Sequence, residues 1–222
     1  MAIKLKKDDS AQLTLQKFSV GLGWKVNQGY DEDFDLDVSA FMVTSSGKIP
    51  ADDYLVFYNS EKRLRAYSDG SLVKPVKIVP YTEWSSNDAM REESRPTDPE
   101  ISVIGSIDNT EGGTGDSETL DIDLSRVRPD VVRIVICVSI YDAIARRQNF
   151  GRVEDAYIRI YEHGKSRMGE EQIRYDLTED FSTSRCVEFV QLRRNGSNWN
   201  VEAVGVGHHG EFDELVNKYY GN

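Results

Sequence analysis

The sequence has few of the residues that build zinc sites, thiol chemistry and disulfide scaffolds. Its 222 residues include only two cysteines and three histidines. Two cysteines cannot staple a disulfide framework, and so few cysteines and histidines leave little for a zinc site. The scarcity of cysteine also favours a reducing compartment, so we expect a cytoplasmic protein.

Long apolar runs and a surplus of basic residues are missing as well. No stretch of 18 apolar residues occurs, so we expect no membrane-spanning helix. The first twelve residues include lysines but no apolar core, so we expect no secretory signal there. The chain has 27 Lys and Arg against 38 Asp and Glu, a net charge of −11 at pH 7. This balance opposes contacts with phosphates, and we expect no nucleic-acid partner.

The prevailing hydrophobic period is two, which is typical of half-buried β-strands. Apolar and polar residues alternate over 34–40, 119–124 and 156–161. Residues 131–140 are instead nearly continuous in branched apolar side chains, which predicts a central strand covered on both faces.

Turn and helix signals complete the predicted architecture. Residues 186–192 and 199–206 read as a hairpin joined through an Asn-Gly-Ser-Asn turn. Apolar residues at helical spacing over 211–220 predict a short C-terminal helix, and further helix is expected near 81–93 or 142–148. The fold class is therefore mainly β, a sandwich of two sheets with a few short helices.

We expect residues 1–222 to form one domain with an inserted excursion at about 74–100. That segment contains four prolines and a polar centre. Within it Trp84 is the best candidate for an exposed aromatic side chain, whereas Trp24 and Trp199 are expected in the core. His208 and His209 are expected to form a surface pair, and Cys186 could be half-exposed.

The first of two acidic clusters covers residues 31–37, where five of seven side chains are carboxylates. If this segment enters a strand, Asp35 and Asp37 project from its solvent face about 6.6 Å apart along the chain, from a rise of roughly 3.3 Å per residue.

The second cluster covers residues 108–118, with four carboxylates, one carboxamide, three glycines and no basic residue. Glycines let such a loop fold back so that its oxygens converge. It is not an EF-hand, because its third and fifth positions, Thr110 and Gly112, are not acids.

Oxygen-only donor sets of this kind suit Ca²⁺, which takes six to eight oxygens. Neither cluster contains cysteine or histidine, which argues against zinc, copper or iron, and Mg²⁺ demands stricter octahedral geometry. Composition alone leaves a second interpretation equally open, in which both clusters are simply solvated loops.

The ordered motifs of the chain resemble those of the TerD family of tellurium-resistance and stress-response proteins. Eight short motifs carry the resemblance: Gly21-Leu22-Gly23-Trp24, Phe34-Asp35-Leu36-Asp37, Phe57-Tyr58-Asn59, Gly105-Ser106-Ile107-Asp108-Asn109, Gly115-Asp116-Ser117-Glu118, Gln148-Asn149-Phe150-Gly151, Trp199 and Gly205-Val206-Gly207. They occur in one order over almost the whole chain.

The resemblance implies a calcium-binding β-sandwich with one or two Ca²⁺ ions. The ligands it implies come from the two acidic segments: Asp35, Asp37, Asp108, Asn109, Asp116 and Glu118. Glu111 and Asn59 are weaker candidates. The second loop is shorter than the family pattern and lacks a central acid at Gly113-Thr114, so a second ion there is less secure.

Three functional hypotheses follow from these residues and the resemblance. The first is a non-enzymatic Ca²⁺-binding stress protein. Its expected partners, besides calcium, are other proteins of a stress-response complex. In one form of this hypothesis, that complex lies at the membrane surface. The alternatives are a carboxylate-based hydrolase or a Ca²⁺-dependent membrane-surface binding module. The sequence offers many carboxylates but no distinct nucleophile, general base or cofactor loop, so we expect no enzyme.

Overall fold

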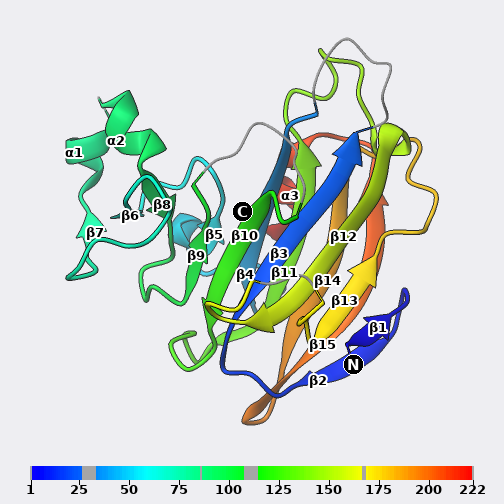
Figure 1. Cartoon of the computed structure of the whole chain (residues 1–222), viewed down its shortest axis with the longest axis horizontal. Helices are drawn as coiled ribbons and strands as arrows, with labels where there is room; N and C mark the ends of the chain where they lie inside the picture. Colours follow the sequence, from blue (N-terminus) through cyan, green and yellow to red (C-terminus); the bar gives the residue numbers. More distant parts are fainter. Residues whose placement is uncertain (1, 27–33, 86, 108–114, 167–168, 222) are drawn as a thin grey trace.

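The computed structural model describes residues 2–26, 34–85, 87–107, 115–166 and 169–221. Two six-stranded sheets face each other, as the period-two pattern predicts (Figure 1). Sheet A has the order β1 (Ile3–Leu5), β13 (Ile173–Asp176), β12 (Val153–Glu162), β3 (Lys17–Val26), β10 (Glu118–Asp123), β9 (Val103–Gly105). Sheet B has the order β2 (Ser10–Leu13), β15 (Asn198–His208), β14 (Cys186–Asn195), β11 (Val131–Ile140), β4 (Leu36–Thr44), β5 (Leu55–Val56).

The core lies between the two sheets. Alternate residues of β3 point inward and are almost fully buried: Phe18, Val20, Leu22 and Trp24. From the other side, Phe189 of β14 contacts Tyr175 of β13, with ring centroids 6.2 Å apart. The predicted β-sandwich is confirmed, and β11 is a central strand as expected.

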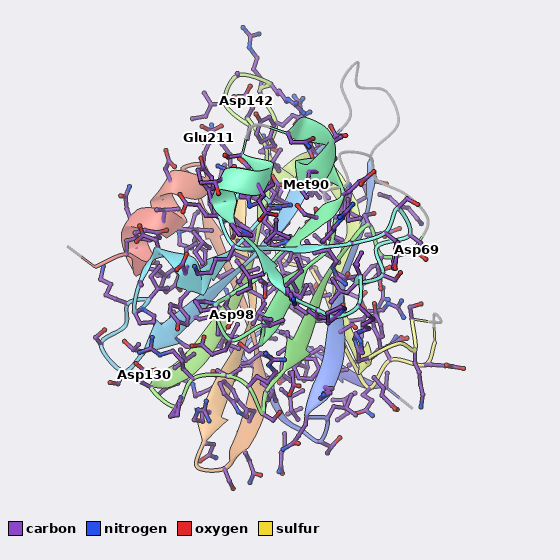
Figure 2. All side chains as sticks on the ribbon, turned by 90° about the vertical axis from the view of Figure 1, so that its left-hand side faces the viewer. Asp69, Met90, Asp98, Asp130, Asp142 and Glu211 are labelled. Carbon is purple, nitrogen blue, oxygen red and sulfur yellow. The ribbon has the colours of Figure 1, made fainter. Side chains whose placement is uncertain are left out.

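The C-terminal helix α3 (Phe212–Tyr219) covers the outer face of sheet B. Phe41 of β4 packs against Tyr219 and Phe212, at centroid distances of 4.9 and 5.9 Å. Just before the helix, Glu211 accepts a hydrogen bond from the backbone N–H of Ile144 at 2.8 Å. Figure 2 shows Asp142, two residues before Ile144, close to Glu211 at one end of the molecule.

The excursion and the segment before it form a small third sheet, sheet C, beside β9 (Figure 1). Its strands are β7 (Ile78–Val79), β6 (Arg63–Arg65) and β8 (Ser94–Pro96), with two short helices, α1 (Tyr81–Trp84) and α2 (Asp88–Glu92). Two 3₁₀ turns lie elsewhere, at Asp52–Tyr54 and Phe150–Arg152. Helix near 81–93 is thus confirmed, whereas 142–147 forms hydrogen-bonded turns without a helix.

Trp84 is not an exposed aromatic, so that expectation is wrong. Its ring is buried, its Nε1 donates to the Glu61 carbonyl at 3.1 Å, and the Arg63 guanidinium lies 5.4 Å from the ring centroid. The excursion therefore has a small core of its own, built around one indole ring. Trp24 and Trp199 are in the main core, as expected.

Candidate metal centre

Parts of both acidic clusters meet where β4 and β10 begin. Glu118 is the first residue of β10, in sheet A, and its Oε2 accepts a hydrogen bond from the Val38 backbone N–H at 2.5 Å. Val38 lies in β4, in sheet B, directly after Asp37. A single side chain thus bridges the two sheets at the point where the clusters enter them. We call Asp35, Asp37 and Glu118 the acidic rim.

The acidic rim is buried. The exposed fractions are 9% for Asp35, 6% for Asp37 and 4% for Glu118. The expectation that Asp35 and Asp37 lie on a solvent face is therefore wrong. Every residue of β4 from Leu36 to Val43 is buried, because sheet A covers one face of the strand and structures such as α3 cover the other. Carboxylates held away from water require compensating interactions.

Asp116 lies on the outer face of sheet A. Its Oδ1 and Oδ2 accept from Nε and Nη2 of Arg159, both at 2.7 Å, and Tyr157 donates to Oδ1 at 3.3 Å. Gly21 makes room for this pair, since a Cβ there would overlap the Asp116 carboxylate. Burial lowers the pKa of Arg159, but the hydrogen bond and charge of Asp116 outweigh it and hold that pKa above its ordinary value.

The remaining predicted ligands divide into two groups. Asp108, Asn109 and Glu111 lie outside the described residues. Asn59 is exposed in the loop that follows β5. Within the described part of the chain, no three Asp, Glu, His or Cys side chains form a group able to hold a metal ion. The six-residue ligand set stays a prediction, and its described members are Asp35, Asp37, Asp116 and Glu118.

All three side chains of the acidic rim are carboxylates. Its side-chain donors are carboxylate oxygens, and the neighbouring sequence at 31–33 and 108–114 contains further carboxylates and a carboxamide. Oxygen donors of this type fit Ca²⁺ and do not favour softer transition metals.

A Ser-His-Asp group on sheet A lacks the arrangement of a catalytic triad. Ser19 Oγ donates to Asp121 Oδ1 at 2.5 Å, and His163 approaches both residues through the same nitrogen, Nδ1, at 3.4 and 3.2 Å. A triad needs the nucleophile on one ring nitrogen and the acid on the other. Ser19 is also buried, so this group orients β3 and β10 and activates no hydroxyl.

Neither cysteine has the features of a nucleophile. Both thiols are free and fully buried, which corrects the half-exposed position considered for Cys186. Burial raises the pKa of Cys186 to about 12 and that of Cys137 well above its ordinary value. A thiolate is therefore strongly disfavoured at both positions near neutral pH.

A cluster around Glu188 was not foreseen from the sequence. Glu188, on the outer face of β14, accepts hydrogen bonds from Nε2 of His208 and the hydroxyl of Tyr219, both at 2.8 Å, and from Nζ of Lys218. His208 is thus largely buried and bridges to Glu214, so the expected surface pair of histidines is wrong at that position. The sequence signal that points to this cluster is Glu188 itself, an acid among the apolar residues of the predicted strand 186–192.

Comparison with known proteins places the chain in a family. The family model described as the TerD domain matches residues 1–71 and 94–219, which leaves 72–93 outside the match. The chain belongs to the TerD domain family. Tellurium resistance protein TerD from an Alcaligenes species is 34% identical over 99% of this chain and 97% of its own length. General stress protein 16U from Bacillus subtilis is 33% identical, with the same coverage.

The fold of this TerD-family chain also occurs among solved structures. The crystal structure of a homologue of telluride resistance protein (TerD) from Streptomyces coelicolor A3(2) has a TM-score of 0.62 and 14% identity, and covers 93% of this chain and 99% of that one. In the described residues of the TerD-family chain, no helix is long and apolar enough to cross a membrane.

Proposed function

We propose that this chain is a non-enzymatic, calcium-binding stress-response protein of the tellurium-resistance type. The observation that carries the proposal is the 2.5 Å hydrogen bond from Val38 to Glu118, which joins the two acidic segments at one place. The names of two relatives, a tellurium resistance protein and a general stress protein, support the stress-response part. Free cysteines agree with the cytoplasmic location that we propose.

The ligands that we propose are Asp35, Asp37 and Glu118, together with Asp108 and Asn109. Asp116 is less suited, because both of its oxygens already accept hydrogen bonds from Arg159. A bound Ca²⁺ would supply positive charge to buried carboxylates that repel one another. The protein's own part is to hold the starts of β4 and β10 together, through the hydrogen bond from the Val38 backbone to Glu118.

This end of the sandwich also offers a surface for a partner protein. The Tyr141 backbone N–H donates to the Asp35 carbonyl at 2.9 Å, and the turn that follows exposes 45% of Tyr141 and 57% of Ile144. Contiguous exposed apolar patches mark interaction sites, and Tyr141 and Ile144 would form the centre of one here. We propose that calcium, by fixing the adjoining segment at Asp35, conditions this surface for another protein of a stress-response complex. A membrane surface is the alternative partner.

Calcium titration by calorimetry tests the proposed site. We expect wild-type protein to bind one or two ions, and Asp35→Asn with Asp37→Asn to lose most of that heat. At a hundredfold excess over Kd, ligation stabilises the folded state by about 2.7 kcal/mol. For a chain of this size that corresponds to a rise in Tm of about 5 to 10 °C, which EDTA reverses.

The matched control is Glu92→Gln with Glu93→Gln, which removes two negative charges from exposed positions of the excursion. It should bind calcium as the wild type does. A calcium response that survives unchanged in the Asp35 and Asp37 double variant would remove this site. Equal binding to liposomes with and without the Tyr141 and Ile144 side chains would remove the membrane alternative.

A further inference from the structure

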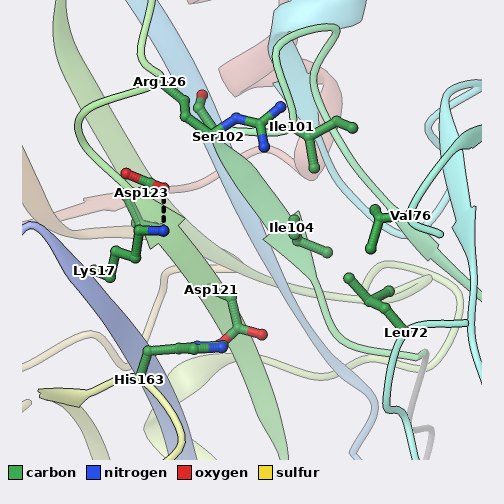
Figure 3. A pocket seen from close by; sticks show the side chains of 11 residues that line it. Lys17, Leu72, Val76, Ile101, Ser102, Ile104, Asp121, Asp123, Arg126 and His163 are labelled. Atoms are coloured by element: carbon green, nitrogen blue, oxygen red, sulfur yellow. Dashed lines mark hydrogen bonds and ion pairs between the residues drawn. The ribbon is translucent and has the colours of Figure 1, made fainter. Parts of the chain in front are cut away.

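A pocket of about 210 Å³ lies on sheet A, toward the end of β10 farther from Glu118 (Figure 3). Its floor comes from β9 and β10, at Ile104 and at Asp121 to Asp123. Val76, on the excursion, and Leu72, just before it, close the opposite side. Because residues 72–93 lie outside the TerD domain match, this wall belongs to a part of the chain that the family model does not describe.

One side of the pocket is aliphatic. Leu72, Val76, Ile101 and Ile104 line it, and each is only partly buried. Figure 3 shows Leu72 and Val76 across from Ile101 and Ile104. Four branched side chains that face a hollow with some of their surface uncovered form a small apolar patch, which gains free energy when a ligand covers it.

Ile101 adopts a conformation that costs free energy. Its φ is 54°, in the left-handed region that a β-branched residue rarely occupies. The fully buried Asp98 enforces it: Oδ1 accepts from the backbone N–H groups of Ser102 and Val103, both at 2.7 Å, and Oδ2 accepts from that of Glu100 at 3.1 Å. Such a backbone conformation costs about 1–3 kcal/mol and persists only where surrounding contacts hold it in place. Strained residues of this kind are often found at binding sites.

The acidic side chains beside the pocket already have partners. Asp121 accepts from Nη2 of Arg95 at 2.8 Å, as well as from Ser19 and His163. Asp123 accepts from Ser125 at 2.5 Å and forms an ion pair with Lys17 at 3.1 Å. The carboxylates therefore offer little to a ligand.

Arg126 is the cationic side chain of this pocket that is best placed to bind an anion. Its Nε donates to the Glu100 carbonyl at 2.7 Å, which orients the guanidinium near Ile101 and Ser102 (Figure 3). Among the residues that the structure describes, no carboxylate lies within ion-pair distance of it. Its outer N–H groups suit a planar carboxylate, which a guanidinium binds through two parallel hydrogen bonds.

We propose that this pocket binds a small aliphatic monocarboxylate, with its carboxylate on Arg126 and its branched or short hydrocarbon body against Leu72, Val76 and Ile104. A cavity of about 150 Å³ can hold benzene, so a pocket of about 210 Å³ fits a small ligand of somewhat more than six non-hydrogen atoms. 4-Methylpentanoate, with about eight non-hydrogen atoms, matches both the size and the chemistry. The site is separate from the acidic rim and does not depend on calcium.

Ligand-observed NMR with 4-methylpentanoate tests the proposal, and calorimetry gives the affinity. We expect a Kd of about 1 mM or tighter, within the efficiency usual for ligands of this size. The uncharged 4-methylpentan-1-ol and the cationic 4-methylpentylamine should bind at least about tenfold more weakly. Acetate, which lacks the hydrocarbon body, should also bind more weakly.

Two variants locate the binding, each with a matched control. Arg126→Gln should weaken it about tenfold, whereas Arg193→Gln, an exposed arginine on sheet B, should leave it unchanged. Val76→Trp fills the pocket and should abolish binding, whereas Val206→Trp adds the same bulk at an exposed valine elsewhere. Circular dichroism verifies that all four variants fold.

Three results would overturn the proposal. The first is a folded wild-type protein that shows no binding of 4-methylpentanoate up to about 10 mM. The second is binding that Arg126→Gln and Val76→Trp leave unchanged, which would place the ligand elsewhere. The third is an alcohol or amine that binds as tightly as the carboxylate, which would remove the role of Arg126.

Discussion

Two places in this molecule bury carboxylates at sheet B, and they differ in the source of the compensating charge. At Glu188 the chain supplies it: His208, Lys218 and Tyr219 all donate to one carboxylate beneath α3. At the acidic rim, Asp35, Asp37 and Glu118 are buried where β4 and β10 begin, and the sequence beside them, at 31–33 and 108–114, is rich in further acids. We propose that calcium supplies charge there.

The comparison teaches that a buried acid by itself does not indicate a metal site. Burial raises the pKa of Glu188, but its three donors outweigh burial and lower that pKa to about 2. Asp116 is a second example, because the guanidinium of Arg159, on another strand of sheet A, forms an ion pair with it. A metal is a reasonable inference only where acids outnumber the cations that the fold brings to them.

The largest expected effect is that of removing Glu188. Glu188→Ala leaves His208 and Lys218 without their shared partner and opens space under α3. Loss of one member of a buried charge cluster costs about 4 kcal/mol. Urea unfolding should show this decrease in the free energy of unfolding, with and without calcium.

Glu202→Ala is the control for Glu188→Ala. Glu202 lies on the neighbouring strand β15 and pairs with Arg193 at 3.0 Å, but it is more exposed. Its loss should cost about 0.5 kcal/mol. Equal costs for the two variants would show that the Glu188 cluster does not hold α3 to the sheet.

The second effect separates Asp116 from the acidic rim. Asp116→Asn leaves the guanidinium of Arg159, which is only 2% exposed, beside a neutral amide. We expect a loss of about 3 kcal/mol in the free energy of unfolding, equal in calcium and in EDTA. The rise in Tm on adding calcium should persist.

The opposite pattern would make Asp116 a ligand. A variant that is as stable as the wild type in EDTA, yet no longer responds to calcium, would contradict the separation that we draw. Arg159→Lys is a useful companion, because it keeps the charge but loses the paired hydrogen bonds to Asp116. It should reproduce part of the loss without altering calcium binding.

The sequence predicts local features of this fold well. Strict alternation predicted the strands, branched residues over 131–140 predicted the central β11, and the Asn-Gly turn predicted the hairpin of β14 and β15. Each of these depends on neighbouring residues, so periodicity and turn chemistry suffice. The C-terminal helix was equally readable from its apolar spacing.

Features that depend on distant segments were not predictable in this way. The acidity of the rim could be read from 31–37 and 108–118, but its burial depends on segments far apart in the chain, such as Glu118 and Val38, which are 80 positions apart. The pairing of Asp116 with Arg159 depends on the register of β12 with β3 and on the missing side chain of Gly21. His208 looked like a surface residue because Glu188 reaches it only through the β14–β15 pairing.

The smallest expected effect is a pH dependence at the Glu188 cluster. The hydrogen bond to Glu188 raises the pKa of His208, burial opposes this, and Glu214 adds to it, with Lys218 as the neighbouring cation. A raised pKa stabilises the fold fully below about 6.5, and that contribution disappears as pH rises through the folded value. For Glu188, whose pKa is depressed, stability disappears as pH falls from about 4.5 towards 2.

His208→Gln isolates the histidine part of this dependence. We expect a loss of about 1.5 kcal/mol at pH 6, the lower end for one hydrogen bond to a charged group, and a smaller difference from wild type as pH rises above 7. Thermal unfolding between pH 5 and 9 measures it, with the half-exposed His163→Gln as the control. A loss that is constant across this range would show that His208 acts by shape alone, and that the chain neutralises Glu188 through Lys218.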